Sequence, residues 1–338
     1  MGKTYLGIDV GHDMLKLALV KDGSVKKTLA VPMPVNLLRD GRITSTETMG
    51  ELLANSMKDN HIRAGLGAVI LSGDVSFIRS TQMPRMSAEQ LMYNIPYEFS
   101  DYITGELKNY LFDYAVVPDL PGAEAPAAED GQAAGSMDLL VSAAESEAVD
   151  SFRRTLRKAG MKLAKAAPAE CAFLNLIRGY EKRTGAKDQE YCIIDLGYRA
   201  IRMYMYRGPR HITTRALDVG LSSLDDIIAE AKGVDAHLAH TYLLTDFEQC
   251  QSQSFCAAAY DNISVELMRA MNFYRFSNPD SQIDRCWLCG GGAALSALRE
   301  SIAATLDIEV RTADELLQGG AETADAFAFV QAVGIAMD

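Results

Sequence analysis

Apolar positions along the chain form two closely similar patterns that begin 186 residues apart. Residues 5–11 are Tyr-Leu-Gly-Ile-Asp-Val-Gly, and residues 191–197 are Tyr-Cys-Ile-Ile-Asp-Leu-Gly. In each copy an apolar strand ends in an Asp-x-Gly turn and a second apolar strand follows, so each copy predicts a β-hairpin. The match extends into the second strand, where Lys16 aligns with Arg202. One repeat over so long a distance indicates two related domains rather than a solenoid, which needs several short repeats.

The region 72–160 interrupts this repeat and predicts a small α+β subdomain. Ser87-x-x-Gln90 is a capping box that predicts a helix through about Tyr102. Strands are predicted over 109–117 and 137–143, and an amphipathic helix over 148–160. Between them, residues 118–136 are rich in Ala, Gly, Pro and acidic residues and contain no basic residue, which predicts a loop.

The second half of the chain predicts a strand pair followed mainly by helices. Ser222-x-x-Asp225 has the spacing of a capping box and predicts the start of a helix over 224–231. Helices continue to about residue 276. A strand over 285–288 then leads into three consecutive glycines and a helix over 294–305, and a further helical segment over 327–337 follows.

Composition and charge exclude several classes of protein. The 338 residues are 48% apolar and 23% charged, which is typical of a globular chain that folds without disulfides or structural metal. The net charge of −12 repels phosphate backbones and anionic lipid. We therefore expect neither a nucleic-acid partner nor direct membrane insertion, since no stretch approaches the roughly 18 apolar residues of a membrane span.

Six scattered cysteines, in a chain that starts without a signal-peptide pattern, predict reduced thiols and a cytoplasmic location. Cys286-x-x-Cys289 has the spacing of a redox or zinc pair, and His237-x-x-His240 has helical metal-ligand spacing. Neither pair has accompanying ligands nearby in the sequence, so we expect ordinary packing for both.

The two Asp-x-Gly turns are the strongest candidates for chemistry. Such a turn places a carboxylate beside backbone N–H groups. A ligand can approach these N–H groups closely because the glycine has no side chain. Two turns that face each other across a cleft can hold a polyphosphate and its Mg²⁺, because carboxylates bind metal-bound waters and amides bind phosphate oxygens. The glycine run at 290–292, before a helix, adds amides and a helix N-terminus that suit a nucleotide.

The order of these motifs resembles the actin-like ATPase superfamily. Gly7-Ile-Asp9-Val-Gly11 through Lys16 resembles its first phosphate motif, residues 195–197 the second, and residues 288–293 the adenosine motif. Residues 167–172 and 333–336 resemble its two connecting helices. The resemblance implies an α/β, actin-like (ribonuclease H-like), duplicated two-lobed fold with an inserted α+β subdomain and a nucleotide between the lobes.

The resemblance also implies domain limits. The first lobe is expected to comprise residues 1–71, 161–189 and 327–338, and the inserted subdomain residues 72–160. The second lobe is expected over residues 190–326, including a helical subdomain over about 222–282.

Carried over residue by residue, the resemblance implies a site for ATP and Mg²⁺. Its cofactor-binding residues are Asp9, Gly11, His12, Lys16, Asp195, Gly197, Arg199, Gly290, Gly291 and Gly292. Asp9 and Asp195 would hold Mg²⁺ through water, and Lys16 would offset phosphate charge. Glu170 is the candidate catalytic residue that orients water. Its alternative role is that of an acid favoured by the helix dipole.

The sequence departs from the superfamily pattern at both turns. His12 stands where Ser or Thr is usual, and Tyr198-Arg199 stands where small residues are usual. Arg199 either clamps phosphate by its charge or fills an empty cleft. Nucleotide binding is therefore expected, whereas significant ATPase turnover is left open.

Within the superfamily, the chain resembles the PilM family of type IV pilus assembly. The resemblance rests on Met83-Pro84-x-Met86-Ser87, on Ile95-Pro96-Tyr97-Glu98-x-x-x-Tyr102-Ile103, on residues 156–160 and on Asn272-Phe273-Tyr274. It implies an ATP-binding cytoplasmic scaffold that binds the short N-terminal cytoplasmic peptide of an inner-membrane PilN-like protein. That partner would recruit it to the inner face of the cytoplasmic membrane, beside the pilus motor and platform components.

The peptide would lie in a groove between the first lobe and the insert. Two other functions stay open within the superfamily. An FtsA-like nucleotide-driven filament is one, although FtsA relatives end in an amphipathic membrane helix that residues 327–338 do not resemble. A small-molecule kinase is the other, although the additional acidic base of such enzymes has no matching motif.

Overall fold

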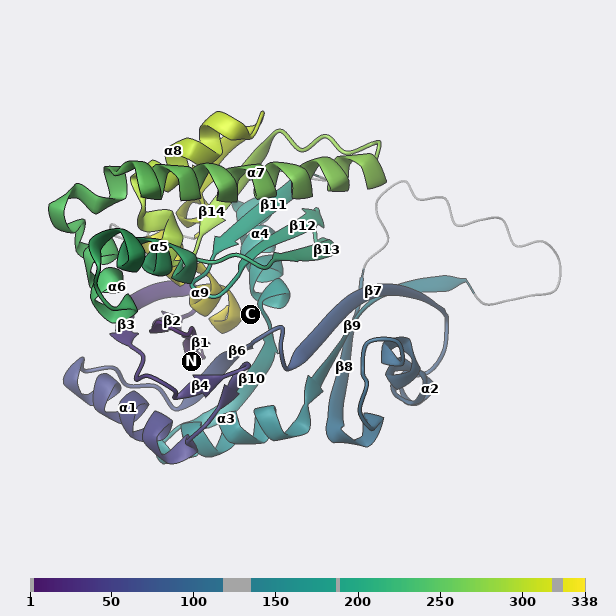
Figure 1. Cartoon of the computed structure of the whole chain (residues 1–338). Coiled ribbons are helices and arrows are strands. Elements are labelled where there is room, and N and C mark those ends of the chain that lie inside the picture. Colours follow the sequence, from purple (N-terminus) through teal and green to yellow (C-terminus); the bar gives the residue numbers. More distant parts are fainter. Residues whose placement is uncertain (1–2, 118–134, 187–188, 318–324, 338) are drawn as a thin grey trace.

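The computed structural model describes residues 3–117, 135–186, 189–317 and 325–337. Residues 118–134 of the predicted loop lie outside the described residues. Figure 1 shows two sheet-containing lobes stacked on each other, with the insert at one side.

The first lobe is built on a five-stranded sheet in the order β10-β6-β1-β2-β3. Strands β1 (Thr4–Val10), β2 (Met14–Lys21) and β3 (Ser24–Pro32) form an antiparallel meander. Strand β6 (Leu66–Leu71) pairs parallel with β1, and β10 (Lys162–Pro168) pairs parallel with β6. Both faces of β1 and β6 are largely buried, as their continuous apolar sequences predict.

The second lobe repeats this topology in the order β13-β12-β11-β14-β15. Its meander is β11 (Glu190–Leu196), β12 (Ile201–Arg207) and β13 (Arg210–Leu217). Strands β14 (Arg285–Cys289) and β15 (Glu309–Thr312) add in parallel. The hairpin register is the same in both lobes, with Asp9 opposite Lys16 and Asp195 opposite Arg202, so the predicted duplication is confirmed.

Two helices pack against each other between the sheets. Helix α4 (Ala169–Thr184) follows β10, and α9 (Val330–Ala336) follows the short 3₁₀ helix η6 (Ala326–Phe329). They join both sheets in one hydrophobic cluster. The Asn175 Nδ2 amide of α4 donates a hydrogen bond of 3.0 Å to the Gly334 carbonyl of α9. This pair of helices therefore connects the lobes at the base of the space between the two hairpins.

Helices α1 (Thr46–Asp59) and α3 (Ser146–Lys158) pack together on the first sheet. The sequence pattern groups α3 with the insert, but Val149, Phe152 and Leu156 lie in the same hydrophobic cluster as the buried residues of β1 and β2. Helix α3 therefore packs with the first lobe, although it directly follows the last strand of the insert.

The second sheet carries a larger set of helices. These are α5 (Ser222–Lys232), α6 (Ala236–Thr245), α7 (Ser254–Ser277) and α8 (Ser296–Thr305). The remaining short elements of the described residues are β4 (Leu38–Arg39), β5 (Arg42–Ile43), η2 (Leu107–Asn109), η3 (Phe247–Ser252), η4 (Gly291–Ala294) and η5 (Ala313–Leu316). No helix in the described part of the chain is long and apolar enough to span a bilayer.

The insert is a three-stranded antiparallel sheet, β7 (Ser76–Pro84), β9 (Ser136–Glu145) and β8 (Tyr110–Val116), in the order β7-β9-β8. It is covered by α2 (Ala88–Asn94) and η1 (Ile95–Phe99). The helix expected to reach Tyr102 ends as an α-helix at Asn94. Pro96, which lacks an N–H group, belongs to the 3₁₀ turn that follows.

The two predicted capping boxes have different outcomes. At α2, the Ser87 hydroxyl accepts from the Gln90 N–H, and the Gln90 side chain accepts from the Ser87 N–H, so this box is confirmed. The box at Ser222 and Asp225 is wrong, because α5 begins without a side-chain cap. Asp225 is instead almost fully buried and bonded to other elements.

Candidate functional site

A cavity of about 1330 Å³ lies between the two lobes and extends along the insert. Both hairpin turns open onto it. Nine of the sequence-predicted site residues line it: Asp9, Gly11, His12, Lys16, Glu170, Asp195, Gly197, Arg199 and Gly291. The duplicated topology thus brings together residues that are more than 180 positions apart in the sequence.

The two turns have the same backbone construction. A Cβ atom on Gly11 would lie 2.8 Å from the Met14 carbonyl oxygen, and one on Gly197 would lie 2.5 Å from the Ala200 carbonyl oxygen. Both distances are below those that real side chains tolerate. The turns themselves therefore require glycine, whether or not a ligand approaches the amides.

In the first hairpin, a carboxylate on β1 and an ammonium group on β2 face each other. The Lys16 ammonium lies 3.8 Å from the Asp9 carboxylate. Burial raises the pKa of Asp9, nearby Lys16 opposes that rise, and the negative charge of Asp195 adds to it. A bound cation would relieve both the burial of this carboxylate and its repulsion from Asp195.

Asp195 has different neighbours. The Gln331 side-chain amide of α9 donates a 2.8 Å hydrogen bond to its carboxylate. Gly290 has a φ of +84°, and a Cβ atom there would lie 2.3 Å from the other Asp195 oxygen. Gly290 and Gly292 do not line the cavity. Gly290 packs against Asp195, and Gly292 packs against Leu196. Of the three predicted glycines, Gly291 alone lines the cavity, so the close packing of Gly290 and Gly292 accounts for those two positions.

Glu170 lies in the first turn of α4, where its carboxylate accepts a 2.8 Å hydrogen bond from the Thr214 hydroxyl. Burial raises the pKa of Glu170. His211 lies 2.9 Å from the same hydroxyl through Nε2, and burial lowers the pKa of His211 to about 4. The imidazole is therefore neutral, and Nε2–H donates to Thr214 while Thr214 donates to Glu170.

Three cationic side chains of the site line the cavity, and two of them, Arg199 and Arg202, lie near His12. Burial lowers the pKa of His12, and the positive charges of Arg199 and Arg202 lower it further, whereas Asp74 and Asp40 act in the opposite direction. Lys16 completes the set on the first lobe. The cavity thus combines two facing carboxylates with several cations, an arrangement suited to a polyphosphate with a divalent metal.

Sequence patterns give no indication of one network at this site. His240 of α6 bonds Asp225 of α5 through Nδ1 at 3.0 Å and Asp13 of the first turn through Nε2 at 3.1 Å. The Tyr198 hydroxyl of the second turn donates to Asp225 at 2.9 Å. These contacts raise the pKa of His240 to about 10, with the hydrogen bond to Asp13 as the largest cause. An imidazolium therefore links the two lobes beside the cavity.

His240 thus has a role other than the metal ligation that its spacing from His237 first suggested. Within the described residues, no three His, Cys, Asp or Glu side chains converge as a metal site. This is compatible with Mg²⁺, which binds through one or two carboxylates, waters and substrate phosphates. Cys286 and Cys289 are both fully buried on β14, as core packing predicts.

Comparison with known proteins identifies the family of this chain. The family model described as "Type IV pilus assembly protein PilM" matches residues 7–338. The chain belongs to the PilM family. None of the curated proteins is detectably similar to it in sequence.

Solved structures show the same fold. A PilM-PilN type IV pilus biogenesis complex superposes with a TM-score of 0.80 at 20% identity, covering 98% of this chain and 97% of that one. The ethanolamine utilization protein EutJ from Carboxydothermus hydrogenoformans gives a TM-score of 0.60 at 11% identity, covering 99% and 89%. MreB 5 of Spiroplasma citri bound to AMPPNP gives 0.51 at 10%, covering 98% and 94%. The predicted actin-like fold is therefore confirmed.

One residue of the PilM-like pattern in the insert, Tyr102, lines the cavity, whereas Met83, Ile95 and Ile103 lie in the core of the insert. Phe77, Ile78, Arg79, Phe99 and Tyr102 line the part of the cavity that runs along β7. Glu98 of the Tyr97-Glu98 pair accepts from the Thr81 hydroxyl at 2.7 Å, and Arg79 lies over the Tyr102 ring at 5.3 Å. These contacts fasten η1 to the sheet and leave Tyr102 about half exposed.

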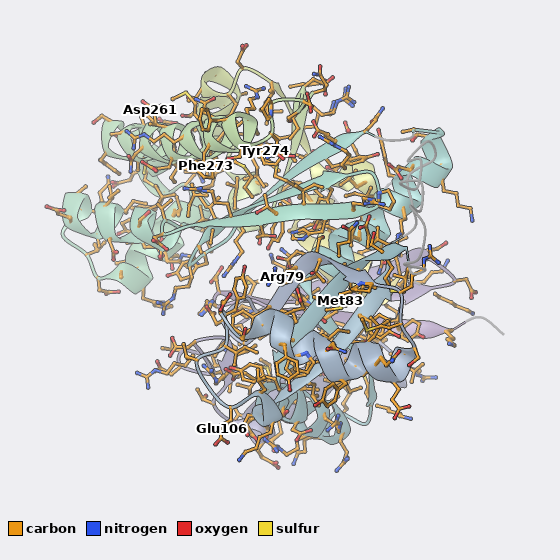
Figure 2. The ribbon with its side chains drawn as sticks, turned by 90° about the vertical axis from the view of Figure 1, so that its right-hand side faces the viewer. Arg79, Met83, Glu106, Asp261, Phe273 and Tyr274 are labelled. Atoms are coloured by element: carbon orange, nitrogen blue, oxygen red, sulfur yellow. The ribbon has the colours of Figure 1, made fainter. Side chains whose placement is uncertain are left out.

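The insert of this PilM-family chain also contacts the second lobe. The Ser80 hydroxyl of β7 donates a 2.6 Å hydrogen bond to the His211 carbonyl of β13, and Arg210 of β13 pairs with Asp138 of β9. Figure 2 looks onto this side of the molecule, with Arg79 and Met83 on the insert and Phe273 and Tyr274 on α7 of the second lobe. The insert therefore touches both lobes rather than the first alone.

Proposed function

We propose that this chain is an ATP-binding scaffold of type IV pilus assembly that binds the N-terminal cytoplasmic peptide of a PilN-like inner-membrane protein. The observation that carries the nucleotide part is the pair of acidic turns, Asp9 and Asp195, which face one cavity together with several cations. Membership of the PilM family supports the role in pilus assembly.

In this proposal ATP supplies the phosphates and Mg²⁺ the charge that joins them to the two carboxylates. Asp9 and Asp195 hold the metal through its waters, and the backbone of the second turn at Gly197 faces the phosphates. The Gly11 N–H already donates to the Met14 carbonyl at 3.0 Å, so Gly11 allows close approach of the backbone but supplies no free donor. Lys16, next to Asp9, offsets the added negative charge. Glu170 is the residue proposed to orient a water if the nucleotide is hydrolysed, with its carboxylate held by Thr214.

The partner part of the proposal rests on the portion of the cavity along the insert. Phe77, Ile78 and Tyr102 offer an apolar, partly aromatic wall beside the edge strand β7, which suits an extended apolar peptide. The similar solved structure is of a PilM-PilN complex, which supports a PilN-like partner. Such a partner would bring the chain to the inner face of the cytoplasmic membrane, near the pilus motor and platform components.

Titration calorimetry with Mg-ATP, and fluorescence anisotropy with a labelled copy of the partner's N-terminal peptide, test the two parts separately. Wild type should bind both ligands. Tyr102→Ala should weaken peptide binding by about tenfold, because a half-buried aromatic anchor is lost. Tyr93→Ala is the matched control, since Tyr93 is exposed on α2 and lies outside the cavity lining, and it should bind peptide like wild type.

Two results would contradict the proposal. Equal peptide affinities for the two tyrosine variants would exclude this groove as the peptide site. Sedimentation of the protein on addition of Mg-ATP, without peptide binding, would favour the FtsA-like filament, and phosphorylation of a sugar or acetate would favour the kinase.

A further inference from the structure

Arg202 differs from its duplicate in the first lobe, although the two residues occupy equivalent positions. Lys16 stands opposite Asp9 in one hairpin, and Arg202 stands opposite Asp195 in the other. Both side chains line the cavity. Lys16 lies 3.8 Å from its carboxylate, whereas Asp195 is bonded by Gln331.

Arg202 has no hydrogen-bond or ion-pair partner of its own among the described residues, although its side chain is half-buried. A guanidinium carries five N–H donors, and no Arg202 nitrogen is a fully buried atom without a partner, so these donors stay accessible from the cavity. The carboxylates of Asp9, Glu170 and Asp195 line the same cavity, but none of them forms an ion pair with Arg202 among the described residues. An unpaired arginine in this position indicates an anion that is supplied from outside the chain.

The Arg202 side chain also reaches the opposite lobe. A Cβ atom added to Gly73, which follows β6 of the first lobe, would lie 3.9 Å from Arg202 Nε. The charge of Arg202 acts on His12 of the first turn and on Glu170 of α4. The guanidinium therefore lies among the first turn, the candidate catalytic residue Glu170 and the end of β6, so an anion that it binds lies between the two lobes.

We propose that Arg202 binds the terminal phosphate of a nucleoside triphosphate and thereby distinguishes the triphosphate from the diphosphate. This rests on the proposed nucleotide function. A diphosphate lacks the group that Arg202 pairs with, so the arginine would stay unpaired and the two lobes would lose this bridge. The preference for triphosphate then comes from a side chain of the second lobe that the sequence motifs do not include.

The test is the affinity of the full chain for Mg-ATP and Mg-ADP, measured by titration calorimetry. Arg202→Gln should weaken Mg-ATP binding by about 10- to 100-fold, the usual range for a lost hydrogen bond to a charged group. It should change Mg-ADP binding by less than about threefold. Arg202→Lys, which keeps the charge but not the planar fork, should give an intermediate loss.

Arg215→Gln is the matched control. Arg215 lies on the neighbouring strand β13, is exposed, and stacks on Phe273 at 4.7 Å, outside the cavity lining. It should leave both affinities unchanged. The melting temperature of ligand-free Arg202→Gln should stay close to that of wild type, because no hydrogen bond or ion pair among the described residues is lost with the guanidinium. An unchanged melting temperature excludes misfolding as the cause.

The outcomes distinguish the role of Arg202 from nucleotide binding by the chain. If wild type binds Mg-ATP but Arg202→Gln weakens Mg-ATP and Mg-ADP equally, or neither, the role of Arg202 is wrong while nucleotide binding stands. If wild type binds neither nucleotide, the proposed function fails, and the role of Arg202 fails with it.

Discussion

The two hairpin turns share a backbone but differ in what their side chains contact. In the first turn, Asp9 has a cation of its own hairpin nearby, since Lys16 lies at 3.8 Å. In the second turn, Asp195 accepts from Gln331 of α9, and Arg202 is left without a partner among the described residues. Duplication has therefore kept the turn geometry, while the cation of one copy is paired and that of the other is available for a ligand.

The residues that follow each aspartate differ as well, and they connect the turns. Asp13 of the first turn bonds His240, and Tyr198 of the second turn donates to Asp225, which also bonds His240. The two bulky departures from the superfamily pattern therefore have different contacts. Tyr198 is held by the helices of its own lobe, whereas Arg199 is exposed in the cavity.

The largest expected effect concerns Gly290, a position at which the two lobes differ. Gly290 directly follows β14 in the second lobe, and the equivalent position of the first lobe is Leu71, the last residue of β6. Gly290→Ala should lower the unfolding free energy by about 2–4 kcal/mol, because of its φ of +84° and the contact with Asp195. Urea unfolding measures this loss. Gly291→Ala should stay within about 0.5 kcal/mol of wild type, because its added Cβ atom would make an ordinary contact of 4.0 Å with Leu221. Equal losses in the two variants would contradict the packing described.

The bridge between the lobes gives the next largest effect. His240→Ala leaves Asp225 buried with Tyr198 as its remaining side-chain donor, so the unfolding free energy should fall by about 2 kcal/mol. His237→Ala is the matched control, because His237 is exposed one turn earlier on the same helix. If both variants lost the same free energy, His240 would not bridge the lobes.

The stabilising contribution of His240 should depend on pH with a definite sign. Its pKa is raised from 6.5 to about 10 in the folded chain, so protonation favours folding. The difference in unfolding free energy between wild type and His240→Ala should be full below about pH 6.5 and should shrink as the pH rises toward 10. Denaturant titrations at a series of pH values measure this difference, and a difference that grew with pH would contradict a charged bridge.

The smallest effect belongs to the contact that distinguishes Asp195 from Asp9. Gln331→Leu should lower the unfolding free energy by about 1 kcal/mol, because one hydrogen bond to a carboxylate is lost. A double-mutant cycle with Asp195→Ala isolates the pair, and we expect a coupling of similar size. Additive losses would show that Gln331 acts on some other group.

Local sequence patterns predicted the parts of the molecule that depend on neighbouring residues. The two hairpins follow from apolar runs on either side of an Asp-x-Gly turn, and the Ser87 capping box follows from polar groups three positions apart. The same reasoning failed at Asp225, which has a capping spacing but is bonded to Tyr198 and His240 instead. The helix of the insert was also predicted to continue to about Tyr102, whereas α2 ends at Asn94 and Pro96 lies in the 3₁₀ turn that follows.

The candidate site was predictable only as far as its backbone turns. Their carboxylates and glycines stand in motifs, whereas Gln331, Thr214 and His240 reach the site through tertiary packing of helices and strands distant in sequence. The unpaired state of Arg202 has no sequence signal, since it depends on the absence of a partner in three dimensions. Its alignment with Lys16 was the one available indication.

The central claim, that the cavity between the duplicated turns binds Mg-ATP, is tested most directly by the melting temperature with and without Mg-ATP in wild type and in Asp9→Ala. A ligand at 100 times its dissociation constant adds about 2.7 kcal/mol to the stability of the folded state. We predict a clear upward shift in wild type that disappears in Asp9→Ala. No shift in wild type, or an equal shift in both proteins, would contradict the claim.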